Sequence, residues 1–203
     1  LTSDRRENRH EQNPEHWWTA VGEACKQAMK GLRPSDRVRA LSVCGTSGTV
    51  LLTDAQGNPL TPGLMYDDAR AADEAERANL HGQSLWTRLG YGHIQTVWGL
   101  PKWMWLAAHH KGPASYFAQQ ADFITGRLAG NRTAADLSNA LKSGCDTIDG
   151  RWDTALMESL GLAPEWLPDL VKPGARIGSV CRAAAAHTGL PEDVPIIAGM
   201  TDG

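Results

Sequence analysis

Apolar and polar residues recur along the 203-residue chain at spacings that predict both helices and strands. Residues 15–29 carry an apolar face at helical spacing, with Asn13 placed to cap the helix and Pro14 in its first turn. Apolar runs bounded by turn residues predict strands at 38–44, 49–54, 64–66 and 194–199. Further helices are expected at 69–80, 101–110, 152–161 and 177–189. Strands come first, helices follow and one strand closes the chain, which predicts an α/β or α+β domain over residues 1–203, with a mostly antiparallel meander.

Composition narrows the class of protein. The formal net charge is -3 and 41% of the residues are hydrophobic, which is ordinary for a globular domain and gives no indication of a nucleic-acid or membrane partner. A short basic cluster near the start, ending at His10, is interrupted by Glu7 and Asn8, so we interpret it as a solvated segment. Four widely spaced cysteines are expected to be free thiols in a reducing cytoplasm, and no apolar run is long enough for a membrane span.

The sequence Gly45-Thr46-Ser47-Gly48 lies between two predicted strands. Its glycines allow the backbone to bend and its hydroxyls could bind a hydroxylated ligand. Gly, Ser and Thr are also the residues that hairpin turns use, so a plain turn explains the segment equally well. A nucleotide-binding P-loop is excluded, because the required Gly-Lys-Ser/Thr and the helix after it are absent.

A second polar segment, Tyr66-Asp67-Asp68-Ala69-Arg70, follows the third predicted strand and precedes a helix. Asp68 could cap that helix, since acidic residues favour its N-terminal end. A cap does not account for the neighbouring Tyr66, Asp67 and Arg70. An aromatic ring beside carboxylates and a guanidinium also suits a sugar-binding edge.

The chain closes on Gly199-Met200-Thr201-Asp202-Gly203, directly after an apolar strand. A carboxylate on a loop that leaves a buried strand is well placed to orient and deprotonate an alcohol. A helix N-cap at Asp202 is the structural alternative. Asp68 and Asp202 could also act as an acid pair in an unrelated hydrolase or transferase.

Several segments, taken in order, resemble the FGGY family of carbohydrate kinases. They are Glu11–Pro14 with Trp17 and Trp18, residues 42–52, residues 57–60, residues 65–70, residues 136–140, residues 173–178 and residues 198–203. No single segment is specific, but seven in family order are. The strings at 45–52 and 139–144 resemble ribulokinase-type pentulose kinases in particular.

The resemblance implies a ribonuclease-H-like, actin-type α/β lobe with a mixed sheet and flanking helices. It implies transfer of the γ-phosphoryl group of ATP, with Mg²⁺, to a hydroxyl of a sugar or polyol, a ketopentose such as D-ribulose being expected. Asp202 matches the catalytic base of the family. The segments that contact sugar in the family match a loop, an aromatic-acid segment and the residue before the base: Thr46, Ser47 and Gly48, Tyr66, Asp67 and Asp68, and Thr201.

The ends of the chain also carry an expectation. It begins without Met and stops just after a strand, so we expect a gene fragment or an excised domain. The resemblance implies a phosphate-binding loop ahead of Glu11 and a second lobe after Gly203, so the lobe is expected to be truncated at both ends and inactive alone. A non-catalytic polyol-binding or structural module of the same fold is the alternative, and a homodimer is left open.

Overall fold

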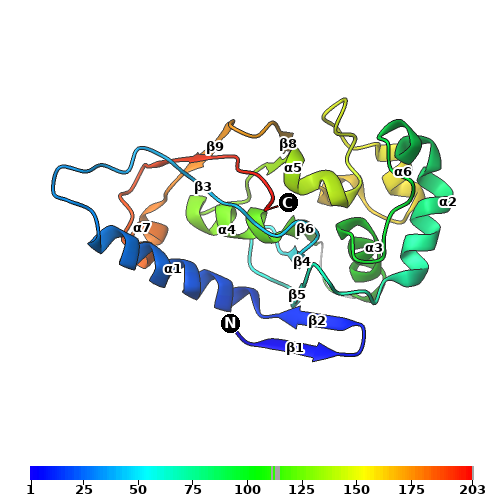
Figure 1. The fold of residues 1–203 in the computed structure, drawn as a ribbon, viewed down its shortest axis with the longest axis horizontal. Coiled ribbons are helices and arrows are strands. Elements are labelled where there is room, and N and C mark those ends of the chain that lie inside the picture. Colours follow the sequence, from blue (N-terminus) through cyan, green and yellow to red (C-terminus); the bar gives the residue numbers. More distant parts are fainter. Residues whose placement is uncertain (111, 113–114, 203) are drawn as a thin grey trace.

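The computed structural model describes residues 1–110, 112 and 115–202. A five-stranded antiparallel sheet in the order β1-β2-β5-β4-β6 crosses the middle of the molecule (Figure 1). Its strands are β1 (Ser3–Arg6), β2 (Arg9–Gln12), β4 (Val50–Thr53), β5 (Gly63–Leu64) and β6 (Tyr116–Gln119). The N-terminal hairpin therefore extends the sheet. Arg5, Arg6 and Arg9 are exposed, as expected for a solvated segment, whereas His10 is buried.

Two smaller sheets complete the strands. In the first, β10 pairs in parallel with β3 and antiparallel with β9; in the second, β7 and β8 are parallel. Their bounds are β3 (Leu41–Ser42), β7 (Ala135–Asp136), β8 (Leu170–Val171), β9 (Arg176–Ser179) and β10 (Pro195–Ile197). The architecture is thus mixed α/β, as expected.

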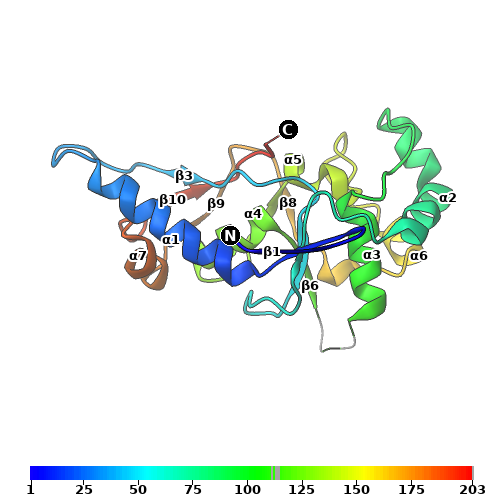
Figure 2. The same ribbon diagram turned by 60° about the horizontal axis from the view of Figure 1, so that its bottom comes forward.

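Helices lie at both ends of the molecule, with the five-stranded sheet between them, while α4 and α5 lie nearer the middle (Figures 1 and 2). Toward one end α1, α4 and α7 pack together, and at the other α2 packs on α3 and α6. The bounds are α1 (Pro14–Lys30), α2 (Ala72–Arg88), α3 (Gly99–His109), α4 (Gln120–Ala129), α5 (Leu137–Ala140), α6 (Thr154–Ser159) and α7 (Arg182–Thr188), with 3₁₀ turns at Leu141–Ser143 and Pro164–Trp166. No helix in the described part of the chain is long and apolar enough to cross a membrane.

Two hydrophobic cores lie on either side of β4. Leu52 belongs to the core that contains Trp86, Trp103 and Met157, whereas its neighbour Leu51 belongs to the other core. Alternate residues of a strand point to opposite faces of a sheet, so a single strand contributes to both cores.

Most of the predicted helices and strands are present, but several differ from the prediction in length. Helix α1 begins as expected, with the Asn13 side chain accepting a hydrogen bond from the Glu15 amide. The predicted strand 38–44 is ordered as a strand only at Leu41–Ser42, and the predicted helix 177–189 is a strand followed by the shorter α7. The meander is wrong in one respect: β3 pairs with β10 and belongs to a different sheet from β4.

Candidate functional site

The loop between β3 and β4 meets the end of the chain. Gly45 and Thr201 form a parallel bridge, and the Asp202 amide donates to the Gly45 carbonyl at 3.1 Å. The Ser47 amide donates to Thr201 Oγ1 at 3.1 Å. These contacts join residues that are more than 150 positions apart in sequence, and they place the exposed Asp202 carboxylate beside the Gly45–Gly48 loop. Gly203 lies outside the described residues.

Helix α5 and the 3₁₀ turn after it support this loop. The Thr201 amide donates to Ser138 Oγ at 3.1 Å. Gly48 has φ +86° and lies against the start of α3: a Cβ at this position would be 3.2 Å from the Val97 carbonyl oxygen and 3.6 Å from Lys142 Cδ. Lys142, which forms no ion pair within the described residues, therefore lies next to the loop.

Asp68 is fully buried in an ion-pair network. Its carboxylate accepts hydrogen bonds from Arg70 at 2.7 Å and from the His10 amide at 2.7 Å. Arg70 also pairs with Glu11 at 2.7 Å and stacks over the Trp105 ring. Charges removed from water are tolerated when they are paired and hydrogen-bonded in this way. Asp68 thus holds the 65–70 segment against the β1–β2 hairpin.

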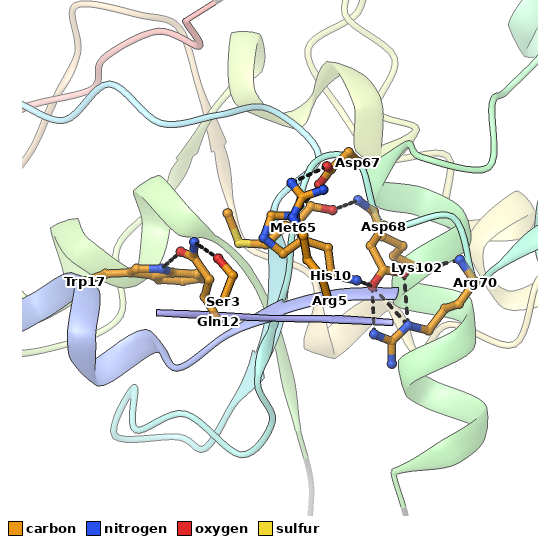
Figure 3. A network of polar contacts seen from close by, with 10 residues as sticks. All are labelled: Ser3, Arg5, His10, Gln12, Trp17, Met65, Asp67, Asp68, Arg70 and Lys102. Atoms are coloured by element: carbon orange, nitrogen blue, oxygen red, sulfur yellow. Dashed lines mark hydrogen bonds and ion pairs between the residues drawn. The ribbon is translucent and has the colours of Figure 1, made fainter. Parts of the chain in front are cut away.

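Asp67 points to the other side of the same segment and keeps 31% of its side chain exposed. Its two oxygens accept from Arg5 at 2.8 Å and from His10 Nδ1 at 2.5 Å (Figure 3). Burial works against ionisation of Asp67, but the His10 hydrogen bond and the charges of His10 and Arg5 outweigh it and hold its pKa below the ordinary value. The ring of Tyr66 beside it is 48% exposed.

Lys102, in the first turns of α3, connects the two groups of residues. Its ammonium is fully buried and donates to the Met65 carbonyl at 2.7 Å, immediately before Tyr66. Burial lowers the pKa of Lys102 to about 7, although the Asp68 and Asp67 charges act in the opposite direction. The charge of Lys142, which lies beside Gly48, acts on the pKa of Lys102 in the same direction as burial.

The predicted site residues therefore fall into two groups. Thr46, Ser47 and Gly48 lie with Thr201 and Asp202 at the loop, whereas Tyr66, Asp67 and Asp68 lie at the hairpin, with Lys102 between. An apolar groove of about 320 Å³ borders the loop at Gly45. A larger hollow of about 560 Å³ between the hairpin and Pro59–Pro62 contains none of the predicted residues, so we place the site by its chemistry rather than by volume.

The structure also decides between several alternatives. Ala71, and not Asp68, occupies the N-cap position of α2, and no side chain of the described residues caps this helix, so the cap interpretation is wrong. The Gly45–Gly48 segment is not a hairpin turn, because its flanking strands belong to different sheets. An acid pair does not fit either, since the Asp68 carboxylate is inaccessible and bound to Arg70 while Asp202 is exposed.

Sequence reasoning gave no role in the site to four basic residues that the structure places there. Arg5 and His10 belong to the basic cluster interpreted as solvated, Lys102 lies in a predicted helix, and Lys142 lies in the 139–144 string without a role of its own. The pairing of Arg5 with His10 across a hairpin could have been suggested by Glu7-Asn8, a polar pair suited to a tight turn between short strands.

Comparison with known proteins identifies the family. Residues 2–203 match the N-terminal domain of the FGGY family of carbohydrate kinases. The chain belongs to this family. Among curated relatives, a xylulose kinase of Streptomyces coelicolor is 31% identical over 181 residues, covering 84% of this chain and 36% of the relative. An autoinducer-2 kinase of Salmonella choleraesuis is 27% identical and covers 91% of this chain and 36% of the relative.

Solved structures of FGGY kinases share the fold. A xylulose kinase from Rhodospirillum rubrum superposes over the whole chain with a TM-score of 0.88 at 25% identity, and 42% of that protein is covered. Glycerol kinase from Plasmodium falciparum, crystallised with ADP, gives a TM-score of 0.86 at 15% identity over the whole chain and 43% of its own length. The actin-like fold expected from sequence is confirmed, whereas the ribulokinase-type assignment is not: xylulose kinase is the nearer name.

Proposed function

We propose that this chain forms the sugar-binding part of a kinase that transfers the γ-phosphoryl group of ATP to a hydroxyl of a ketopentose. The chain spans about a third of the length of the curated relatives, so this activity belongs to a longer protein. The observation that carries the proposal is the exposed Asp202 carboxylate, held beside the Ser47 loop by backbone hydrogen bonds. Xylulose kinase relatives support a ketopentose, and D-xylulose and D-ribulose are the first substrates to test.

In this proposal Asp202 is the general base. A carboxylate within hydrogen-bond reach of an alcohol can accept its proton as the oxygen attacks phosphorus. Ser47 and Thr46 supply polar groups at the loop, and Thr201 keeps Ser47 and Asp202 in register through its hydroxyl. Catalysis of phosphoryl transfer depends largely on such positioning.

ATP and Mg²⁺ are proposed as the phosphoryl donor and its metal. Among the described residues, no cluster of three or more His, Cys, Asp or Glu side chains could hold a metal ion. Mg²⁺ is commonly bound through one or two carboxylates together with phosphate oxygens and water. A single exposed carboxylate at Asp202 fits an ion that is held mainly by the nucleotide.

The proposal is tested by ADP release from the longer protein with D-xylulose, D-ribulose and glycerol. We expect one of the ketopentoses to be phosphorylated, and Asp202→Asn to lower kcat at least about 100-fold, because general base catalysis contributes on this scale. Asp193→Asn, on an exposed turn before β10, is the matched control and should retain activity. The proposal is contradicted if none of the polyols tested gives ADP release, or if Asp202→Asn has an undiminished rate.

The same experiment separates the alternative of a non-catalytic module. Such a module would bind a ketopentose in calorimetric titration without releasing ADP. In that case Ser47→Ala would still weaken binding, whereas Asp202→Asn would have no rate to change.

A further inference from the structure

The β1–β2 hairpin presents two basic side chains on one face. Arg5 and His10 are directly paired across the hairpin, whereas the next pair is Arg6 and Arg9. Successive residues of a strand point to opposite faces, so Arg5 and His10 share a face that Arg6 does not. Arg6 is 78% exposed and forms an ion pair with Asp4.

Asp67 lies opposite the shared face of Arg5 and His10. Arg5 reaches one of its carboxylate oxygens at 2.8 Å and His10 reaches the other at 2.5 Å (Figure 3). The two contacts come from opposite strands of the hairpin and therefore fix the carboxylate in rotation as well as in position. A carboxylate oxygen has two acceptor sites, so each oxygen can still accept a hydrogen bond from a hydroxyl group of a ligand.

The backbone of the Asp67 segment is fixed on both sides. The Met65 amide donates to the His10 carbonyl at 2.9 Å and the Ala69 amide donates to the Asn8 carbonyl at 2.8 Å. Lys102, on α3, donates to the Met65 carbonyl. These hydrogen bonds hold the main chain around Asp67 and do not involve the side chains of Arg5 and His10. The contacts of those two side chains therefore act on the orientation of the Asp67 carboxylate.

The contact made by His10 is separable from its packing. The ring is buried, and its Nε2 atom has no hydrogen-bond partner within the described residues. Its polar interaction is therefore the Nδ1 contact with Asp67. A substitution that keeps the volume but removes the donor isolates that contact.

We propose that Arg5 and His10 are positioning residues that orient Asp67 toward the sugar, which makes the basic hairpin a specificity-determining part of the site. The inference rests on the proposed function. It goes beyond it by giving a role to Arg5 and His10, which precede the Glu11–Pro14 segment of the family resemblance. In the absence of the hairpin contacts, the carboxylate is free to rotate and its hydrogen bonds to sugar hydroxyls weaken.

The test measures kcat and KM for the ketopentose in the longer protein. His10→Leu is expected to raise KM about tenfold, the scale of a hydrogen bond to a charged group, with kcat changed less than about threefold. His10→Asn keeps a donor near the Nδ1 position and is expected to restore most of the affinity. Arg5→Met is expected to raise KM about two- to threefold, because the ion pair is partly exposed.

Three comparisons make the result decisive. Arg6→Met, on the other face, should leave KM unchanged. In an Asp67→Asn background, His10→Leu should have little further effect on KM, since both changes act on one carboxylate. Purely structural damage would instead lower the melting temperature and would not be rescued by His10→Asn.

Each outcome has a distinct reading. Unchanged KM in His10→Leu, while Asp202→Asn still abolishes turnover, overturns this inference and leaves the proposed function standing. Additive effects of His10→Leu and Asp67→Asn also overturn it. Absence of turnover with any polyol in the wild-type protein removes the proposed function and this inference with it.

Discussion

Lys102 is fully buried, and its ammonium donates a hydrogen bond to the Met65 carbonyl. Burial lowers its pKa to about 7. Below about pH 7 it is charged in the folded and the unfolded chain alike, so burial of the charge costs stability throughout that range. Above pH 7 the folded chain releases this proton, whereas the unfolded chain keeps it up to the ordinary pKa of 10.5. The unfolded chain then binds more protons, and stability rises with pH.

We therefore expect Lys102 to add a positive slope to the free energy of unfolding between pH 7 and 9, of at most about 1.4 kcal/mol per pH unit. Urea denaturation of wild type and Lys102→Met across this range measures the slope. The free energy of unfolding of wild type minus that of Lys102→Met is expected to increase with pH. Lys30→Met, at the exposed end of α1, should show a constant difference. A constant difference for Lys102→Met would contradict the prediction.

The contacts of other residues could be predicted from the sequence only where the hydrogen-bond partner lies close by in the chain. Asn13 caps α1 through a residue two positions away, and the pattern predicted it. Asp68 finds its partners in Arg70, two positions on, and in the backbone of His10, 58 positions back. Nothing in the local sequence indicates the second contact, so the sequence left a helix cap and a sugar-binding edge as the alternatives for Asp68.

At the scale of elements, the segment from Gly45 to Gly48 connects two sheets. β3 is bound to β10, whereas β4 lies between β5 and β6. The strands themselves were predictable from their apolar runs, and the meander predicted the antiparallel pairing of β4 with β5. The pairing of β3 with β10 was not predictable, because partners separated by more than 100 residues leave no local signal. The predicted loop residues are brought together with Thr201 and Asp202 by this pairing, which only the resemblance had suggested.

Gly48 sets the shape of this connection through its positive φ. We expect Gly48→Ala to lower stability by about 1–2 kcal/mol, the cost of a left-handed conformation for an L-residue, and to weaken ketopentose binding. The added Cβ would crowd the Val97 carbonyl oxygen at 3.2 Å and push the loop. Calorimetric titration and thermal melts of the same sample measure both effects.

Gly57→Ala is the control for this change. Gly57 has φ +83°, but a Cβ there meets nothing within 4 Å and the turn lies away from both groups of site residues. It should lose a similar stability without losing affinity. Equal affinity losses in the two variants would show that backbone strain, and not the position of the loop, is responsible.

At the scale of the whole molecule, two cores share one strand. Leu51 and Leu52 are both fully buried, on opposite faces of β4. Loss of packing in either core would expose one face of β4, the strand whose opposite face is buried in the other core. The fold class was predictable from the order of elements, but the division into two cores depends on tertiary pairing that the sequence pattern does not reveal.

We expect this chain to unfold in one cooperative transition. Met157→Ala, in one core, and Ile196→Ala, in the other, should each lower its midpoint, with a loss of about 2–5 kcal/mol per site. Calorimetry, with far-UV circular dichroism as a second probe, tests this directly. Two separated transitions, each moved by one variant alone, would show that the cores unfold independently.

The buried pair of Asp68 and Arg70 has a consequence for how this protein can diverge. Loss of Arg70 leaves the fully buried Asp68 carboxylate without its ion-pair partner, at a cost of about 3–5 kcal/mol, against a total stability of about 5–15 kcal/mol for a typical domain. A lineage passing through this replacement would carry a much less stable intermediate. We therefore expect replacement of Arg70 to be accompanied by a change at Asp68 in descendants.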